Sequence, residues 1–321
     1  MRSVKSNLQK IKGDASFRSF YRKTNNARNS IIVYATKDKE KNLLIYDAIN
    51  SLLIKNKILA PKLYKENYKK NFIEIEDFGD DTVLKLLKKI GSNKIKLYKK
   101  SINLLSEIQK IKQYKIKNFN GKNYKVPTYD DNKLFKEAKL FSDWYAKKYI
   151  SKKKLTKFNI KINKQIRSLL LNLKLKNETL VHRDFHVSNL MKFKKELATV
   201  DTQDALIGNR AYDLASLIDD VRFKSNKKLK DIIYNYYLKL NKNEINKVTL
   251  LNDFEILSVI RNMKIIGIFT RLASRDKKKE YLKLIPYAWK LIELRIKNNQ
   301  IFEGLKRTLD INFSQKIRNI K

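Results

Sequence analysis

The chain has 321 residues and a hydrophobic content of 42%, enough for one large or two modest domains with a packed core. It contains no cysteine and 2 histidines, which excludes disulfides, thiolate nucleophiles and cysteine-ligated metals and argues against a histidine-rich metal cage. The 73 Lys and Arg against 32 Asp and Glu give a net charge of +41, but the lysines are spread along the whole chain, so we expect a solvated basic surface without a dedicated nucleic-acid partner.

No stretch approaches the roughly 20 consecutive apolar residues of a membrane span, so no such span is predicted. Residues 1–8 lack the apolar run of a secretory signal peptide, and we therefore expect a cytoplasmic protein. The sequence leaves the oligomeric state open.

The first 76 residues contain short apolar or alternating segments that are typical of β-strands. One helix interrupts them, because apolar residues recur with helical spacing from residue 40 to about residue 54. Three strands, a helix and two strands form the small lobe of a protein-kinase-like fold. The predicted strands are 8–12, 17–23, 30–35, 62–66 and 72–76.

Helical periodicity dominates the rest of the chain. The predicted fold class is α+β, a protein-kinase-like bilobal fold with a small β-rich lobe over residues 1–78 and a larger, mainly helical lobe over 79–321. Helices are predicted over 84–90, 95–111 and 134–150, before residue 180, and from residue 210 to about 309, with a lysine-rich loop over 112–125.

The most informative motif reads H-R-D-x-x-x-x-N, from His182 through Asp184 to Asn189. A short apolar strand then ends at Asp201, 17 positions after Asp184 (201 − 184). Phosphoryl transfer uses one carboxylate to accept the hydroxyl proton, and an amide oxygen with a second carboxylate to hold Mg²⁺ on the ATP phosphates. We therefore predict a kinase that uses ATP and Mg²⁺, with Asp184 as the catalytic residue and Asn189 and Asp201 as metal ligands.

The turn before the second strand carries Gly13 and Ser16, where a kinase places its glycine-rich phosphate cover, although an ordinary hairpin turn would look similar. Arg18 and Arg22 lie four residues apart on the next predicted strand and hence on one face. They are predicted to reach the phosphates; the alternative is a pair of solvated arginines at a sheet edge.

Residues 76–80, which begin with Glu76, are predicted to form the hinge whose backbone meets the adenine. The pattern departs from a kinase in the third strand, which offers no lysine, and Tyr34 is a plausible occupant of the lysine position. Either Arg18, Arg22 or Lys37 replaces that lysine, or the chain is a catalytically inactive relative.

Glu137 and Trp144 lie on the predicted amphipathic helix 134–150. Such aromatic positions are most often core packing. The functional alternative is that Trp144 stacks on a sugar ring while Glu137 bonds its hydroxyls. The segment Arg261–Lys264 likewise has two interpretations: a solvated helix face, or a wall of the acceptor site.

Several of these segments together resemble the aminoglycoside-phosphotransferase superfamily and, more narrowly, the bacterial anomeric kinases of N-acetylmuramate and N-acetylglucosamine. The likeness covers about residues 8–295. This chain has Thr202 where that group commonly has Phe, and residues 187–188 also vary. The segments that carry the resemblance are Gly13–Arg18, Glu76–Asp80, Phe141–Tyr145, His182–His186, Asp201–Ala205, Gly208–Leu214 and Arg261–Gly267.

The resemblance implies ATP-dependent phosphorylation of a small-molecule sugar at its anomeric hydroxyl, giving a 1-phosphate for nucleotide-sugar synthesis in cell-wall recycling. It implies that His186, Gln203 and Asp204 contact the acceptor and that Asp213 anchors the catalytic loop. Two alternatives stay open: a kinase for another alcohol, such as an aminoglycoside or choline, and a non-catalytic basic binding protein on a kinase-like scaffold.

Overall fold

The structure, a computed structural model, describes residues 7–11, 18–24, 28–35 and 42–320. They form two compact units: unit 1 comprises residues 1–127 and 182–206, and unit 2 comprises residues 128–181 and 207–321. Residues 79–127 and 182–206 belong to the same unit as residues 1–78, and the predicted lobes over residues 1–78 and 79–321 stay a prediction. Gly13, Ser16 and Lys37 lie outside the described residues.

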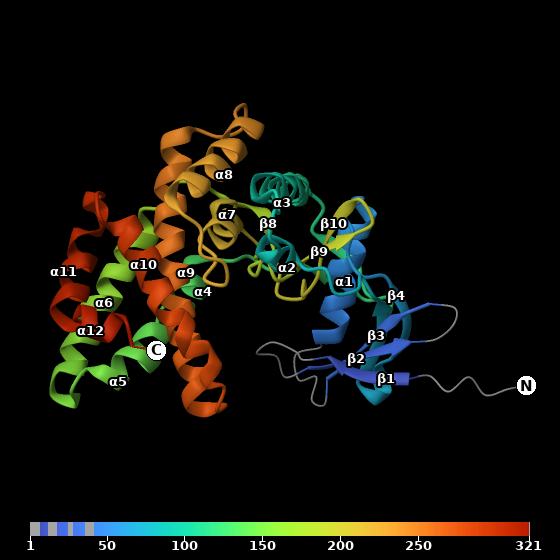
Figure 1. Cartoon of the computed structure of the whole chain (residues 1–321), viewed down its shortest axis with the longest axis horizontal. Helices are drawn as coiled ribbons and strands as arrows, with labels where there is room; N and C mark the ends of the chain where they lie inside the picture. The colour runs from blue at the N-terminus through green and yellow to red at the C-terminus, as the bar shows by residue number, and fades with distance from the viewer. Residues whose placement is uncertain (1–6, 12–17, 25–27, 36–41, 321) are drawn as a thin grey trace, which may run out of the picture. The chain divides into compact units, whose positions relative to one another are not determined.

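Unit 1 is built on an antiparallel five-stranded sheet in the order β1-β2-β3-β5-β4 (Figure 1). The predicted strands are confirmed to within a few residues, because each carries the alternating or apolar pattern of a half-buried strand. The strands are β1 (Asn7–Ile11), β2 (Ser19–Thr24), β3 (Ser30–Tyr34), β4 (Leu63–Asn67) and β5 (Phe72–Glu76).

Helix α1 (Asn42–Lys55) covers the inner face of this sheet, where Leu43 and Tyr46 join a buried cluster that includes Val33 and Ile73. Successive side chains of a strand point to opposite faces. Tyr34 therefore lies on the face of β3 opposite Val33, which removes it from the inward-facing lysine position proposed from the sequence.

Apart from the turn η1 (Tyr68–Lys70) between β4 and β5, the remaining elements of unit 1 follow β5. Phe78 packs against Met191 and stacks on Phe193 at 4.8 Å between ring centroids, which ties the segment after β5 to the hairpin β9–β10. The elements are α2 (Val83–Lys88), α3 (Lys94–Gln109), β6 (Lys115–Lys117), β7 (Asn123–Lys125), β9 (Leu190–Phe193) and β10 (Glu196–Thr199), with the 3₁₀ turn η1 (Tyr68–Lys70) inside the sheet region.

The predicted lysine-rich loop over 112–125 is wrong in part, since β6 and β7 form a hairpin within it. The Asn118 side chain closes the turn by accepting hydrogen bonds from the backbone amides of Asn120 and Lys122, at 3.0 and 3.3 Å. Phe119 at its tip meets Tyr68 edge-on, at 6.0 Å, and packs against the sheet core. Lysines at alternate positions hid the strand pattern.

Unit 2 is organised around the long helix α9 (Lys247–Arg275), against which α7, α10 and the turn η2 pack. Two short strands, β8 (Asn177–Val181) and β11 (Leu206–Asn209), pair beside it. The other elements are α4 (Asp131–Ala138), η2 (Phe141–Ala146), α5 (Lys147–Tyr149), α6 (Lys152–Leu171), α7 (Ala211–Ile218), α8 (Lys227–Leu240), η3 (Lys279–Leu284), α10 (Ile285–Ile296), η4 (Gln300–Phe302), α11 (Glu303–Asn312) and α12 (Gln315–Arg318).

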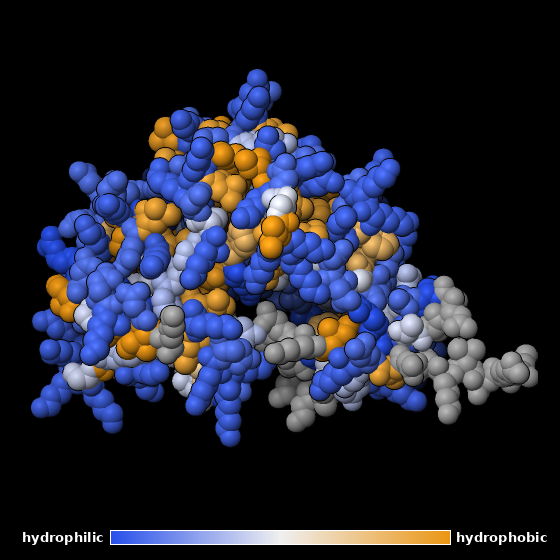
Figure 2. All heavy atoms as spheres, in the orientation of Figure 1, coloured by the Kyte–Doolittle hydropathy of each residue, from blue (hydrophilic) through white to orange (hydrophobic). Residues whose placement is uncertain are grey.

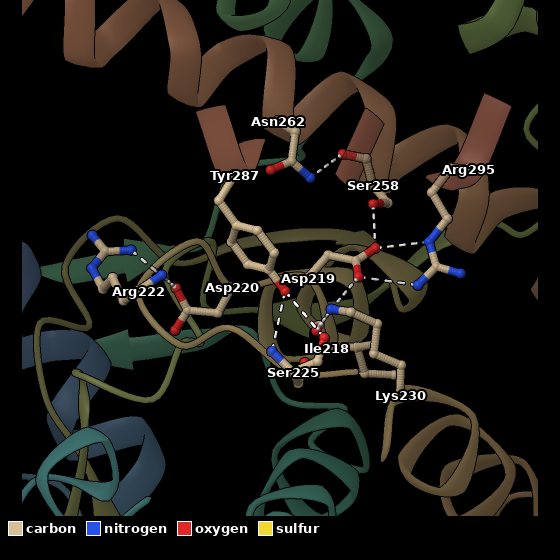
Figure 3. Close-up of polar contacts among 10 residues, drawn as sticks. All are labelled: Ile218, Asp219, Asp220, Arg222, Ser225, Lys230, Ser258, Asn262, Tyr287 and Arg295. Carbon is tan, nitrogen blue, oxygen red and sulfur yellow. Dashed lines mark hydrogen bonds and ion pairs between the residues drawn. The ribbon is translucent and has the colours of Figure 1, made fainter. Parts of the chain in front are cut away.

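Asp219 is the buried electrostatic centre of unit 2 (Figure 3). Its carboxylate accepts hydrogen bonds from Lys230 Nζ at 2.9 Å, from Arg295 at 2.8 and 3.0 Å, and from Ser258 Oγ at 2.6 Å. Burial opposes its ionisation, but the two cations outweigh this cost and lower the pKa of Asp219. The cluster joins α7, α8, α9 and α10.

The helix predicted over 134–150 is broken in the structure into α4, the π-helical turn η2 and α5. Helix α9 approaches this region very closely at Gly267, where an added Cβ would lie 2.3 Å from the carbonyl carbon of Leu140. A π-helical turn locally changes the rotation of a helix, a change that apolar periodicity does not reveal.

No helix in the described ranges is long and apolar enough to cross a membrane. Figure 2 shows hydrophilic side chains distributed over the whole visible face, with smaller hydrophobic areas between them.

Candidate active site

The loop after β8 folds back on itself around Asp184. Its carbonyl oxygen accepts hydrogen bonds from the His186 amide at 2.9 Å and from Asn189 Nδ2 at 3.1 Å. The carbonyl of Asn189 in turn accepts from the Val200 amide at 3.0 Å, directly before Asp201. The motif residues that lie 17 positions apart are thus joined through backbone and side-chain bonds.

Asp201 has a left-handed backbone with φ of 64°, a conformation that costs a non-glycine residue about 1–3 kcal/mol. Its Oδ1 accepts a hydrogen bond from Arg18 Nη2 at 2.9 Å. Burial raises the pKa of the Asp201 carboxyl; the Arg18 guanidinium opposes the rise and the nearby Asp184 carboxylate adds to it. Two carboxylates and one arginine therefore form a single electrostatic unit.

Arg18 is 7% exposed, and its guanidinium lies 5.8 Å from the centre of the Phe20 ring and 5.9 Å from that of Tyr46. Of Arg18 and Arg22, the two cations considered for the missing lysine that lie within the described residues, Arg18 pairs with Asp201. The aromatic walls hold its planar group in place through cation–π contact.

Arg22 is engaged at the segment after β5. It donates to Asp77 Oδ2 at 2.6 Å and to Asp80 Oδ2 at 2.9 Å, and these bonds raise the pKa of Arg22. Asp77 also accepts from the amide of Gly79, whose φ of 79° suits glycine. The predicted hinge is a turn clamped by Arg22, and the arginine predicted to meet phosphate already has two carboxylate partners.

A cavity of about 400 Å³ lies entirely within unit 1. It brings together four residues predicted to bind the cofactor: Arg22, Glu76, Asn189 and Asp201. Its other lining residues are Ile11, Phe20, Ile31, Tyr46, Pro61, Ile75, Asp77, Phe78, Gly79, Asp80, Thr82, Lys85, Ser188, Met191 and Val200. The apolar walls of the cavity suit a flat base, and the charged groups at the strand end suit the phosphates joined to it.

The sequence analysis missed Tyr46 and Asn50, which lie one turn apart on α1. Both are buried, and Tyr46 lines the cavity. The sequence did carry a signal for these two residues, since they are polar groups at core positions of a predicted helix. Buried polar side chains need hydrogen-bond partners, so such positions indicate contacts to other segments.

Asn189 and Asp201 fit a Mg²⁺ ion by the chemistry of their donor atoms. Both line the cavity, and both offer the oxygen ligands that this ion prefers. Asn189 Nδ2 donates a hydrogen bond to the Asp184 carbonyl oxygen, so the side-chain oxygen of Asn189 is the atom that can bind a cation. The Asp201 side chain keeps 38% exposure despite its bond to Arg18.

The residues predicted to contact the acceptor divide between the two units. His186 and Gln203 are buried in unit 1, and Asp204 is exposed there. Gln203 Nε2 donates to Asp204 Oδ2 at 2.9 Å, while Gln203 Oε1 is buried without a hydrogen-bond partner among the described residues. An amide oxygen in this state is suited to accept a ligand hydroxyl.

Glu137 and Trp144 belong to unit 2. Glu137 accepts a hydrogen bond from the Tyr129 hydroxyl and pairs with Lys264 Nζ at 2.8 Å. Trp144 is half-buried. The aromatic core nearby is formed instead by Phe141, Tyr145, Trp289 and Phe313, with ring centroids 5.4–5.8 Å apart.

Arg261 is 3% exposed, one turn before Lys264 on α9. Its Nη1 is buried without a hydrogen-bond partner in the part of the chain that the structure describes. A buried cation is costly without an anion beside it. Lys230 and Arg295, by comparison, share Asp219. The predicted alternative of a solvated face at Arg261 is wrong.

The phosphotransferase enzyme family matches residues 7–244 of this chain. A relative named N-acetylmuramate/N-acetylglucosamine kinase from Neisseria meningitidis serogroup B is 27% identical over 280 residues, covering 85% of this chain and 80% of the relative. A relative of the same name from Pseudomonas aeruginosa is 27% identical over 290 residues, covering 88% and 82%.

Solved structures share the fold. Aminoglycoside phosphotransferase APH(2'')-Ib, with ADP bound, superposes with a TM-score of 0.61 at 15% identity and covers 91% of this chain and 93% of its own. Choline kinase LicA from Streptococcus pneumoniae gives a TM-score of 0.61 at 11% identity, with coverage of 94% and 93%. The predicted protein-kinase-like α+β fold is confirmed. The chain belongs to the phosphotransferase enzyme family and is an ATP-dependent kinase that acts on a hydroxyl group.

Proposed function

We propose that this kinase phosphorylates the anomeric hydroxyl of an N-acetylated amino sugar, N-acetylmuramate or N-acetylglucosamine, and that the 1-phosphate serves cell-wall recycling. The names of the relatives at 27% identity support this acceptor class. The observation that carries the proposal is that Asn189 and Asp201 line one cavity, while the carbonyl oxygen of Asp184 accepts a hydrogen bond from Asn189 Nδ2 at 3.1 Å.

In the proposed reaction the anomeric oxygen forms a bond to the γ-phosphorus of ATP, the bond from that phosphorus to the β–γ bridging oxygen breaks, and ADP leaves. The proton of the hydroxyl passes to Asp184. An anomeric hydroxyl is more acidic than an ordinary alcohol, so a single carboxylate suffices as the base. Asn189 and Asp201 would hold Mg²⁺, which when bound neutralises charge on the transferred group.

Arg18 supplies a fixed positive charge beside Asp201, and we assign it the phosphate contact that the missing lysine would make. A guanidinium matches phosphate oxygens with two donors, which a lysine ammonium cannot do in the same plane. The aromatic rings on either side keep this group from swinging away.

The pairing of Glu137, a predicted acceptor residue, supports an acceptor that is carboxylated or neutral over one that is cationic. A cationic acceptor needs carboxylates, and Glu137 is already neutralised by Lys264. The buried guanidinium of Arg261 instead suits the carboxylate of N-acetylmuramate.

A panel of sugars with ATP and Mg²⁺, with the products analysed by phosphorus NMR, tests the proposal. We expect a 1-phosphate from N-acetylmuramate or N-acetylglucosamine, and no product from the methyl glycoside of either sugar, whose C1 oxygen is blocked. Phosphate at C6, or reaction of a blocked sugar, would exclude the anomeric assignment and leave the kinase assignment intact.

The Arg261→Gln variant tests the acceptor class. We expect kcat/KM for N-acetylmuramate to fall by about 10- to 100-fold, the usual effect of removing a charged partner, and kcat/KM for N-acetylglucosamine to change much less. Arg275→Gln, on the same helix at an exposed position, is the matched control. An equal loss for both sugars would mean that Arg261 does not recognise the carboxylate.

A further inference from the structure

Thr202, the residue directly after the proposed metal ligand, faces α1. It is fully buried, and its Oγ1 donates to Asn50 Oδ1 at 2.6 Å. Asn50 is 3% exposed, and its Nδ2 donates to the carbonyl oxygen of Pro61 at 3.1 Å. Position 202, where the similar kinases commonly have Phe, therefore lies at the contact between α1 and the segment that contains Asp201.

Tyr46 extends this contact by one helical turn. Its ring lies beside the Arg18 guanidinium, and its hydroxyl lies near the Asn50 side chain and the backbone of Asp201. Helix α1 thus presents two polar groups, at positions i and i+4 of one face, to residues 201 and 202.

The backbone of Asp201 needs such support. Its left-handed conformation is unfavourable for a residue with a Cβ and persists where neighbouring groups hold it. The bond from Arg18 Nη2 to Asp201 Oδ1 holds the side chain of Asp201. If the backbone relaxed, the carboxylate could remain on Arg18 while turning away from Asn189.

We propose that Asn50 and Thr202, together with the Tyr46 hydroxyl, are positioning residues that fix the Asp201 backbone so that its carboxylate shares a cation with Asn189. This inference rests on the proposed metal role of Asp201. The hydrogen bond from the Thr202 hydroxyl to the Asn50 amide oxygen is directional, so it restrains the orientation of the backbone at residue 202. An apolar side chain at this position would not form such a bond.

The test compares Thr202→Val with Thr199→Val. Both remove a fully buried hydroxyl from the same segment, but Thr199 Oγ1 has no hydrogen-bond partner among the described residues, so its loss should be harmless. Thr202→Ser, which keeps the hydroxyl, is the rescue variant. Calorimetry measures Kd for ADP with and without Mg²⁺ well below each variant's Tm.

We expect Thr202→Val to weaken Mg²⁺-dependent ADP binding by roughly 5- to 30-fold, as for loss of one buried hydrogen bond. Metal-free ADP binding should change by less than about twofold, because the adenine walls are untouched. Thr199→Val and Thr202→Ser should resemble the wild type. A lower Tm of Thr202→Val with an unchanged Mg²⁺ effect would show a purely structural bond and overturn the proposal.

Tyr46→Phe is the second variant, in case Thr202→Val does not fold. It keeps the ring beside Arg18 and removes the hydroxyl near the Asp201 backbone. The same selective loss of the Mg²⁺ effect is expected, and an unchanged effect would overturn the proposal. If the wild type itself binds ADP equally with and without Mg²⁺, the metal assignment in the proposed function fails, which is a different result.

Discussion

Asp184 combines a backbone carbonyl that orders the loop with a carboxylate that we assign to proton transfer. The carbonyl is bonded by Asn189 and by the His186 amide. A change confined to the carboxylate should leave these bonds intact, because they do not involve it. The loop geometry and the chemistry of Asp184 can therefore be separated by substitution.

Asp184→Asn should lower turnover by on the order of 10²–10⁴ while leaving ATP binding nearly intact, since the amide keeps the shape of the side chain and loses the base. Steady-state kinetics and nucleotide calorimetry on the same preparation measure both effects. Unchanged turnover would remove Asp184 from the proton-transfer step.

Helix α9 and the turn η2 meet at a contact that has room only for glycine. At Gly267 an added Cβ would lie 2.3–2.6 Å from backbone atoms of Leu140 and Phe141, which cannot move as a side-chain end can. At Gly304, on α11, the nearest atom is Gln165 Nε2 at 3.3 Å, the end of a side chain that donates to the Gly304 carbonyl oxygen and to Thr308 Oγ1. The two glycines thus differ in the rigidity of what faces them.

Gly267→Ala should destabilise the protein by about 1–3 kcal/mol or more, because the core must shift to admit the methyl group. Gly304→Ala should be close to neutral or stabilising, since alanine is the better helix former. Denaturant unfolding of both variants measures the difference. Equal stabilities would mean that the α9–η2 contact is looser than described.

Asp47 links α1 to the hairpin β6–β7. Burial raises the pKa of Asp47 from 3.8 to about 6, although the nearby Phe119 backbone and Ser51 side chain favour the ionised form. The folded state therefore holds this proton more tightly than the unfolded state does. Stability from this group is fully present below pH about 3.8 and is lost as pH rises through about 6.

Asp47→Asn cannot titrate and keeps an oxygen for the Phe119 amide. We expect its Tm relative to the wild type to rise between pH 4 and pH 7, and then to level off, because the wild type alone is penalised once its carboxyl ionises. Thermal unfolding across that range measures the difference. Parallel Tm curves for the two proteins would contradict the raised pKa.

The net charge of +41 acts on the molecule as a whole. If it is a spread, solvated charge, nucleic acid should bind weakly, without sequence preference, and lose affinity steeply between low and physiological salt. Titration of duplex and single-stranded oligonucleotides at several salt concentrations tests this. Selective nanomolar binding at physiological salt would instead favour the basic binding protein considered from the sequence.

Local patterns in the chain were sufficient to predict the sheet strands, helix α1 and the catalytic motif, because alternation, helical spacing and motif spacing are properties of neighbouring residues. The same patterns failed at the hairpin β6–β7 and at η2. Lysines at alternate positions masked the strands of the hairpin, and the path of η2 depends on a glycine more than 120 residues away, at position 267.

The partners within the candidate site were beyond sequence reasoning. Arg18 and Asp201 are 183 positions apart, and Asn50 and Thr202 are 152 apart. The residue types predicted a phosphoryl-transfer site with Asp184, Asn189 and Asp201. The sequence did not predict which cation replaces the missing lysine or which groups support the Asp201 backbone. Both depend on how α1 and β2 pack against the segment that contains Asp201, because bonds between distant segments form only when the chain folds.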